Sequence, residues 1–209
     1  MDFNLEATNW DNERRSNRAK IIVEEISKTI KIQSQYSALE FVCGTGLVSF
    51  NLCDQFSSIT LIDTSKGMID VLNEKIQHHK MINMVVVQID INVELSLPDK
   101  YDVIYTSMAL HHIKDTETTL KNLYKLLNCG GYLCIIDLTE DDGSFHKREK
   151  DFNGHNRFNQ DDLKKLLNKI GFQEVVTNVF YNYENIIDGT LVKYSLFSMT
   201  CRRLEAVIN

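Results

Sequence analysis

In Leu39-Glu40-Phe41-Val42-Cys43-Gly44-Thr45-Gly46-Leu47, an apolar run leads directly into two glycines that stand one residue apart. Residues 37–42 are predicted to form a buried first strand, and the glycines a sharp turn into a helix that begins near Leu47. A strand, a glycine turn and a helix N-terminus together present free backbone N–H groups and a positive dipole end. This arrangement suits a ligand that carries a carboxylate or a phosphate.

A second apolar strand, Ile59-Thr60-Leu61-Ile62-Asp63, ends in an acid 17 residues past Gly46. A carboxylate at that place can accept hydrogen bonds from both hydroxyls of a ribose. The alternative is an acid that only caps the next helix. Together the two stretches predict a nucleoside-containing cofactor held between the ends of two adjacent parallel strands.

Composition favours a small-molecule partner. The chain has 209 residues and a net charge of −6, and it contains no basic run, so nucleic acid and anionic membranes are disfavoured as partners. Five scattered cysteines without a C-x-x-C pair fit reduced thiols of a cytoplasmic protein better than disulfides or a zinc site, and we expect no metal. No signal-peptide order and no membrane-spanning apolar stretch is seen. Nothing in the sequence indicates the oligomeric state.

Strands and helices are expected to alternate along the chain. The expected helices cover residues 13–32, 47–54, 116–128 and 160–170, and a further helix is capped by Thr64 or Ser65 and has apolar inner-face residues as far as Ile76. Asp115 and Asn159 are the expected caps of the last two helices, and Gly171 is the expected end of the last one. The expected strands cover residues 37–42, 58–62, 84–89, 101–105, 132–138, 172–179 and 193–201. This order predicts an α/β fold, Rossmann-like and doubly wound, with a mostly parallel seven-stranded sheet. No helix separates the last two strands, so the last strand is expected to be antiparallel.

The N-terminal segment is expected to cover the site. We expect a single domain over residues 1–209, with a loosely attached arm over residues 1–12 and the arm plus first helix, residues 1–35, acting as a lid. Trp10, Arg14 and Arg18 are the candidate lid residues. An exposed cap that merely packs on the sheet is the alternative.

Six stretches in order resemble one family. They are Leu39-Glu40-x-x-Cys43-Gly44-Thr45-Gly46, Asp63-Thr64-Ser65-x-x-Met68, Ile89-Asp90, Tyr101-Asp102-Val103-Ile104 with Leu110-His111-His112, Leu126-Leu127-x-x-Gly130-Gly131 and Gly171-Phe172. Over residues 36–200 the chain resembles class I S-adenosylmethionine-dependent methyltransferases, in particular the small-molecule branch similar to ubiquinone/menaquinone C-methyltransferases.

The resemblance implies S-adenosyl-L-methionine as the cofactor and a role for each matching residue. Gly44 and Gly46 would approach its methionine part, and Glu40 would order the loop or meet the ammonium through water. Asp63 would hold the ribose beside Thr64, and Met68 would pack on the adenine. The remaining implied contacts are Asp90 and the Ile91 N–H with the adenine, and the Thr106 carbonyl with the ammonium. Met68 as plain core and Asp90 as a solvated acid stay open.

Two features concern catalysis. The family usually has glycine where this chain has Val42, and a β-branched side chain there narrows the space between backbone and cofactor.

His111, His112, His146 and His155 follow strands four and five, at the sheet edge where such folds bind ligands. His112 and His146 are the candidate general bases, and a surface or supporting role is the alternative for each.

The sequence therefore predicts methyl transfer to a small-molecule acceptor by in-line displacement. Two rivals remain. One is a nicotinamide-dependent reductase, which the Gly44-x-Gly46 turn and Asp63 partly imitate, although Ser49 stands where its third glycine would be. The other is a non-catalytic module that binds S-adenosylmethionine, or that has lost the pocket because of Val42.

Overall fold

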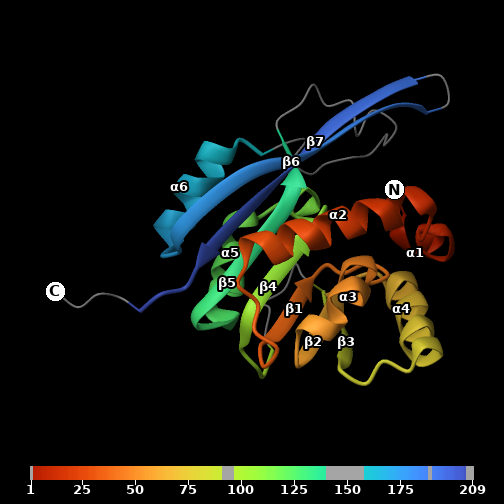
Figure 1. Ribbon diagram of the computed structural model, residues 1–209, viewed down its shortest axis with the longest axis horizontal. Helices are drawn as coiled ribbons and strands as arrows, with labels where there is room; N and C mark the ends of the chain where they lie inside the picture. Colours follow the sequence, from red (N-terminus) through yellow and green to blue (C-terminus); the bar gives the residue numbers. More distant parts are fainter. Residues whose placement is uncertain (1, 91–96, 140–157, 188–189, 206–209) are drawn as a thin grey trace.

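The computed structural model describes residues 2–90, 97–139, 158–187 and 190–205. Seven strands form one sheet in the order β3-β2-β1-β4-β5-β7-β6 (Figure 1). The strands are β1 Ser37–Phe41, β2 Ser58–Asp63, β3 Met84–Gln88, β4 Tyr101–Ser107, β5 Leu127–Leu138, β6 Gln173–Ile187 and β7 Thr190–Arg202. The first five are parallel, and β7 runs antiparallel to both β5 and β6. The predicted fold class is confirmed.

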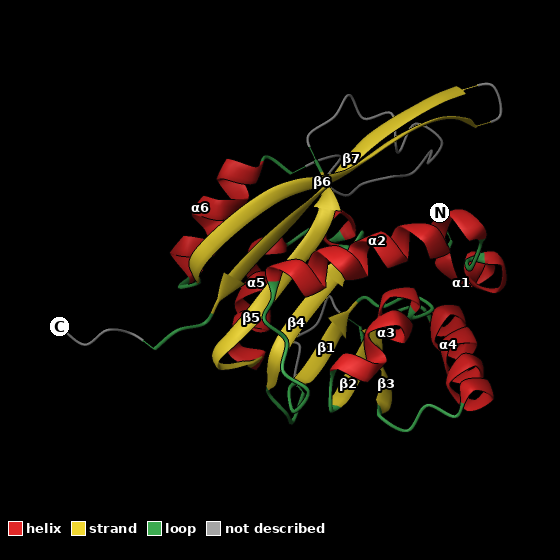
Figure 2. Ribbon diagram, in the orientation of Figure 1, coloured by secondary structure: helices red, strands yellow, loops and turns green. Residues whose placement is uncertain are grey.

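Helices cover both faces of the sheet (Figure 2). One buried core joins the strands to α2 Glu13–Thr29, α3 Leu47–Leu52 and α4 Lys66–His79, and the other joins them to α5 Thr116–Leu126 and α6 Gln160–Ile170. Short 3₁₀ turns are η1 Ala7–Asn9, η2 Cys53–Gln55 and η3 Leu110–His112. Adjacent strand residues alternate between the two cores, as Ala38 and Leu39 do, because successive side chains point to opposite faces.

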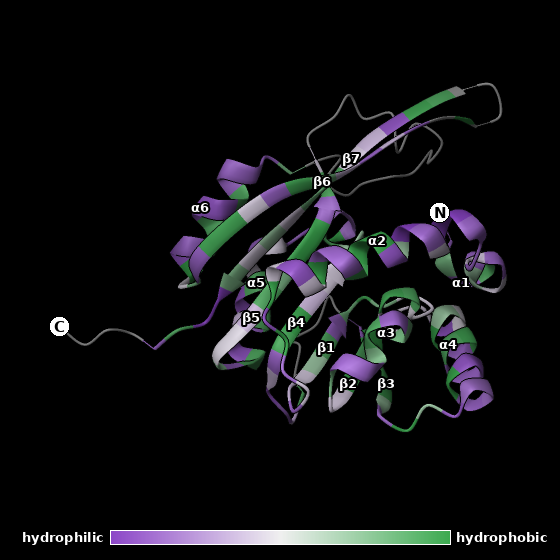
Figure 3. Ribbon diagram, in the orientation of Figure 1, coloured by the Kyte–Doolittle hydropathy of each residue, from purple (hydrophilic) through white to green (hydrophobic). Residues whose placement is uncertain are grey.

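The helix ends follow local capping chemistry. The Ser65 hydroxyl accepts from the Met68 N–H, Asp115 accepts from the Thr118 N–H, and Asn159 accepts at the start of α6. Gly171 ends α6 with a φ of 117°, which favours a residue without a side chain. Hydrophilic residues line the outer turns of α6 (Figure 3), so its apolar stripe faces the sheet.

The last two strands are longer than predicted. β6 and β7 pair from Gln173 with Arg202 to Ile187 with Thr190, so most of the described residues between the predicted strands 172–179 and 193–201 also belong to strands. Tyr183 and Tyr194 face each other with ring centroids 4.9 Å apart. Cross-strand aromatic pairs of this kind stabilise a hairpin. Its polar residues interrupt the alternation of apolar and polar side chains by which strands are predicted from a sequence.

The N-terminal arm is docked, contrary to the expectation of a loose segment. It contains α1 Phe3–Glu6 and η1, and Ala7 is buried. The Asn4 amide oxygen accepts from the Ser65 hydroxyl and from the Gly67 N–H, both at 2.9 Å. In the described parts of the chain, no helix combines the length and the apolar character needed to cross a bilayer.

Candidate functional site

A cavity of about 280 Å³ opens at the carboxyl ends of β1, β2 and β4. The arm and α2 close its other side, with Phe3, Trp10, Arg15, Arg18 and Ile22 in its wall. Its volume lies just below the range of about 300–1,000 Å³ that is typical of small-molecule sites. Ligand sites of open α/β sheets lie at this edge.

Gly44 lines the cavity, and its expected approach to a cofactor stays a prediction. Its φ is +54°, and a Cβ added there would lie 3.8 Å from Trp10 Nε1 and 4.0 Å from Met68 Sδ. The absence of a side chain therefore leaves room between the turn and the arm.

Gly46 is not among the residues that line the cavity, and its expected approach to a cofactor stays a prediction. Its φ is +76°, and a Cβ there would lie 2.7 Å from Leu72 Cδ1 and 3.3 Å from Leu61 Cδ2. This glycine is required by the left-handed start of α3 and by close packing against α4 and β2.

Val42 adopts a left-handed backbone conformation, with a φ of 58°. Such a conformation is costly for an L-residue, by roughly 1–2 kcal/mol, and glycine avoids the cost. Val42 also lines the cavity, so its side chain occupies space that a glycine would leave open. The departure seen in the sequence thus has both a steric and a conformational consequence.

Asp63 is buried at the end of β2 and lines the cavity. Oδ2 accepts from the Gly44 N–H at 2.8 Å, and Oδ1 accepts from the Ser65 N–H at 2.8 Å. Burial raises the pKa of this carboxyl, and the backbone hydrogen bonds oppose that shift. Each carboxylate oxygen keeps further lone pairs, so the group can still accept from ligand hydroxyls.

Glu40 lies at the floor of the cavity and is 2% exposed. Its Oε2 accepts from the Ser49 hydroxyl, which also lies 2.6 Å from the Tyr105 hydroxyl. Burial raises the pKa of Glu40 to about 8, against the opposing hydrogen bonds from Ser49. The carboxyl therefore keeps its proton near neutral pH unless a cation enters.

Other predicted cofactor residues divide between the cavity and its surroundings. Thr64 and Met68 line the cavity, and Met68 is 1% exposed. Thr106 is fully buried in β4 and does not line it, whereas the next residues Ser107 and Met108 do. Its predicted carbonyl contact stays a prediction.

The predicted adenine contacts stay untested. Asp90 follows β3, is exposed, and is outside the set that lines the cavity. Ile91 and the candidate base His146 lie outside the described residues.

His112 is the candidate base that the fold brings to the cavity. Its ring centroid lies 5.3 Å from that of Phe3 and 4.1 Å from that of His111. His111 is buried behind it, with Nδ1 2.5 Å from Asp137 Oδ1, and its backbone N–H donates to Asp137 Oδ2 at 3.1 Å. Asp137 therefore ties the turn that carries His112 to β5.

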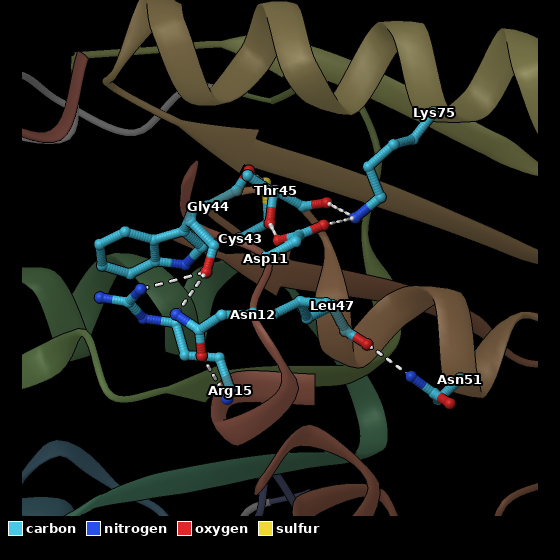
Figure 4. A network of polar contacts seen from close by, with 10 residues as sticks. Asp11, Asn12, Arg15, Cys43, Gly44, Thr45, Leu47, Asn51 and Lys75 are labelled. Carbon is cyan, nitrogen blue, oxygen red and sulfur yellow. Dashed lines mark hydrogen bonds and ion pairs between the residues drawn. The ribbon is translucent and has the colours of Figure 1, made fainter. Parts of the chain in front are cut away.

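A network of polar contacts holds the arm against the glycine turn (Figure 4). Asp11 accepts from the Thr45 hydroxyl, and Lys75 Nζ donates to Asp11 Oδ2 at 2.6 Å and to the Thr45 carbonyl at 2.7 Å. Of the predicted lid residues, Trp10 and Arg18 line the cavity, whereas Arg14 is exposed.

Arg15 also lines the cavity, although the sequence reasoning did not name it. Its guanidinium carbon lies 3.9 Å from the Trp10 ring centroid. The available signal was its position three residues before Arg18, which places both on one helix face. Among the described residues, no group of three or more His, Cys, Asp or Glu side chains is placed to hold a metal ion.

Comparison of sequences finds methyltransferases. Residues 39–133 match the family described as "Methyltransferase domain". An uncharacterized methyltransferase of Schizosaccharomyces pombe is 35% identical over 54% of this chain and 43% of its own length. A malonyl-[acyl-carrier protein] O-methyltransferase of Priestia megaterium is 29% identical over 63% of this chain and 47% of its own length. The chain thus matches less than half the length of these curated relatives.

Comparison of structures confirms the fold. A SAM-dependent methyltransferase from Aquifex aeolicus superposes with a TM-score of 0.71 at 17% identity, over 96% of this chain and 98% of that one. Phosphoethanolamine N-methyltransferase 2 of Haemonchus contortus, in complex with S-adenosyl-L-methionine, superposes with a TM-score of 0.73 at 14% identity, over 88% of this chain and 52% of that one.

Proposed function

We propose that this chain, whose residues 39–133 match the family described as "Methyltransferase domain", binds S-adenosyl-L-methionine and transfers its methyl group to a small-molecule acceptor. The observation that carries the proposal is the cavity itself. Gly44, Asp63, Thr64 and Met68 reach it from β1, β2 and α4, in the order that the family motifs imply.

The residues present fit this cofactor. Gly44 leaves the room that a Cβ would fill, and Asp63 has lone pairs available for the ribose hydroxyls. Glu40 is a buried acid whose raised pKa falls when a cation approaches, so it suits the cofactor's ammonium. When bound, the cofactor supplies a methyl group on a sulfonium, which is already a strong leaving group.

The protein's own part is alignment and, where needed, proton removal. Positioning can lower a barrier by roughly 7–11 kcal/mol in favourable cases. We assign to His112 the removal of a proton from a hydroxyl, amine or acidic carbon of the acceptor, because it lines the cavity and Asp137 holds its turn through His111. We further propose that residues 1–35 act as the lid, since Trp10 and Arg18 already form one wall.

The proposal is tested by isothermal titration with S-adenosylhomocysteine, followed by a methyl-transfer assay on a panel of small acceptors. We expect binding at one site per chain. The reductase alternative predicts binding of NADH instead, and Ser49 disfavours it, because this side chain is fully buried and bonded to Glu40. Failure of the wild type to bind, with binding restored by Val42→Gly, would favour the non-catalytic module.

A further inference from the structure

The cavity wall is divided by charge. Its two acids, Glu40 and Asp63, come from β1 and β2. Its two arginines, Arg15 and Arg18, come from one face of α2. A cofactor that carries a cationic sulfonium and an ammonium suits the acidic side. The arginine side suits an anion, which is either the cofactor's own carboxylate or a group of the acceptor.

Arg18 is bonded to a strand that is distant in the sheet from the strands that carry the acids. Its Nη1 donates to the Tyr194 hydroxyl at 3.2 Å, and Tyr194 belongs to β7. In the sheet, β7 lies three places from β1 and four from β2. If the cofactor runs from its ribose at β2 to its methionine part at β1, Arg18 would face the acceptor's side of the site.

The charge of Arg18 is not matched by an acid within the described residues. No carboxylate there forms an ion pair with Arg15 or Arg18. The pKa of Arg15 is lowered, first by burial and then by the positive charges of Arg14 and Arg18. The negative charges of Glu6 and Asp11 oppose this shift, and Asp11 already bonds Thr45 and Lys75. An anion at this wall would relieve the repulsion.

The surroundings of Arg18 also limit the body of the ligand. Ala19, Ile22 and Ile113 are buried and line the same cavity. A planar guanidinium in an apolar wall recognises a carboxylate through two parallel hydrogen bonds. Tyr194 fixes one nitrogen and leaves other donors of the guanidinium for this contact.

We propose that Arg18 is a specificity residue, and that the methyl acceptor is a small molecule with a carboxylate group and a short apolar body, bound between Arg18 and His112. That the bound molecule is the methyl acceptor rests on the proposed function. That the cavity binds an anion rests on the cavity alone. It assigns the carboxylate as the group that is recognised.

The probes are butyrate and its neutral isostere butyramide, titrated by NMR into the protein with and without S-adenosylhomocysteine. A charged hydrogen bond contributes roughly 1.5–3 kcal/mol, so we expect butyrate to bind at least about 10-fold more tightly than butyramide. Arg18→Met keeps the length and removes the charge, and we expect this preference to fall below about 2-fold. Arg18→Lys should keep part of it.

Arg14→Met is the matched control, because Arg14 lies on the same helix but is exposed. It removes the same charge and should leave the preference intact. Thermal melts of all three variants establish that they fold. Equal binding of both probes to the wild type, binding of neither, or a preference that survives Arg18→Met would overturn the proposal.

One further experiment distinguishes binding of the acceptor's carboxylate from binding of the cofactor's own carboxylate. Arg18→Met should leave the affinity for S-adenosylhomocysteine within about 2-fold. A loss of 10-fold or more, with unchanged affinity for methylthioadenosine, which lacks the amino-acid part, would assign Arg18 to the cofactor and overturn the proposal. If the wild type binds no S-adenosylhomocysteine, the proposed function fails, while the comparison of butyrate with butyramide still decides the anion site.

Discussion

The backbone N–H of Gly44 donates to Asp63 Oδ2 at 2.8 Å, which joins the turn after β1 to the end of β2. Both residues line the cavity. The same carboxylate accepts from the Ser65 N–H, so one buried acid organises the glycine turn and the start of α4. The candidate ribose acceptor is therefore also part of the framework of the site.

Asp63→Ala is expected to weaken binding of S-adenosylhomocysteine by about 1.5–3 kcal/mol, because it removes a charged hydrogen-bond acceptor. It should also lower the melting temperature, since the Gly44 and Ser65 N–H groups lose their acceptor. Calorimetric titration and thermal melting measure the two effects. Asp70→Ala, in an exposed pair with Lys66, is the control and should change neither. Unchanged affinity in Asp63→Ala would remove Asp63 from the site.

Val42→Gly is expected to tighten binding of S-adenosylhomocysteine, because it clears the cavity wall. Its effect on stability should be small, under about 1 kcal/mol, since relief of the left-handed strain offsets the loss of packing and the flexibility of glycine. Val42→Ala keeps most of the strain but opens part of the space, so its affinity should fall between the two. Weaker binding in Val42→Gly would contradict the steric account.

The raised pKa of Glu40 predicts a pH dependence of stability. Its ordinary value is 4.5 and its value in the fold is about 8, so between these pH values the folded protein holds a proton that the unfolded chain has lost. The contribution of Glu40 to the free energy of unfolding therefore falls as pH rises through this window. The side chain in Glu40→Gln cannot ionise. The free energy of unfolding of this variant, relative to that of the wild type, should therefore rise by at least ~1.4 kcal/mol between pH 5 and pH 8, as measured by urea titrations. A constant difference would show that Glu40 titrates normally.

Asp11→Asn is expected to loosen the arm, because it weakens the contact with Lys75 and Thr45. Limited proteolysis within residues 2–12 should become faster, and S-adenosylhomocysteine should slow it again if the arm closes over the ligand. Lys66→Met removes an exposed cation elsewhere on α4 and should leave the rate unchanged. Equal cleavage with and without ligand would contradict the lid proposal.

The sequence predicts much of the fold because its signals are local. Apolar strands, the caps Ser65, Asp115 and Asn159, and the stop at Gly171 each need only a few neighbouring residues. The proximity of Gly44 and Asp63 was predictable too, because adjacent parallel strands end at one edge, but their hydrogen bond was not.

The features that were missed depend on distant contacts. Asn4 reaches Ser65 and Asp11 reaches Lys75, across more than 60 residues of sequence. No local pattern in a polar arm indicates such partners. Gly44 and Gly46 look alike in the sequence, and only the positions of Trp10 and Leu72 show that one faces the cavity and the other the core.

The central claim is that the cavity between Gly44, Asp63 and the arm holds a sulfonium nucleoside. Isothermal titration of the purified wild-type protein with S-adenosylhomocysteine, and separately with NADH, tests it most directly. The account predicts saturable heat at one site per chain with the first ligand and none with the second. Heat with NADH alone, or with neither ligand, would contradict it.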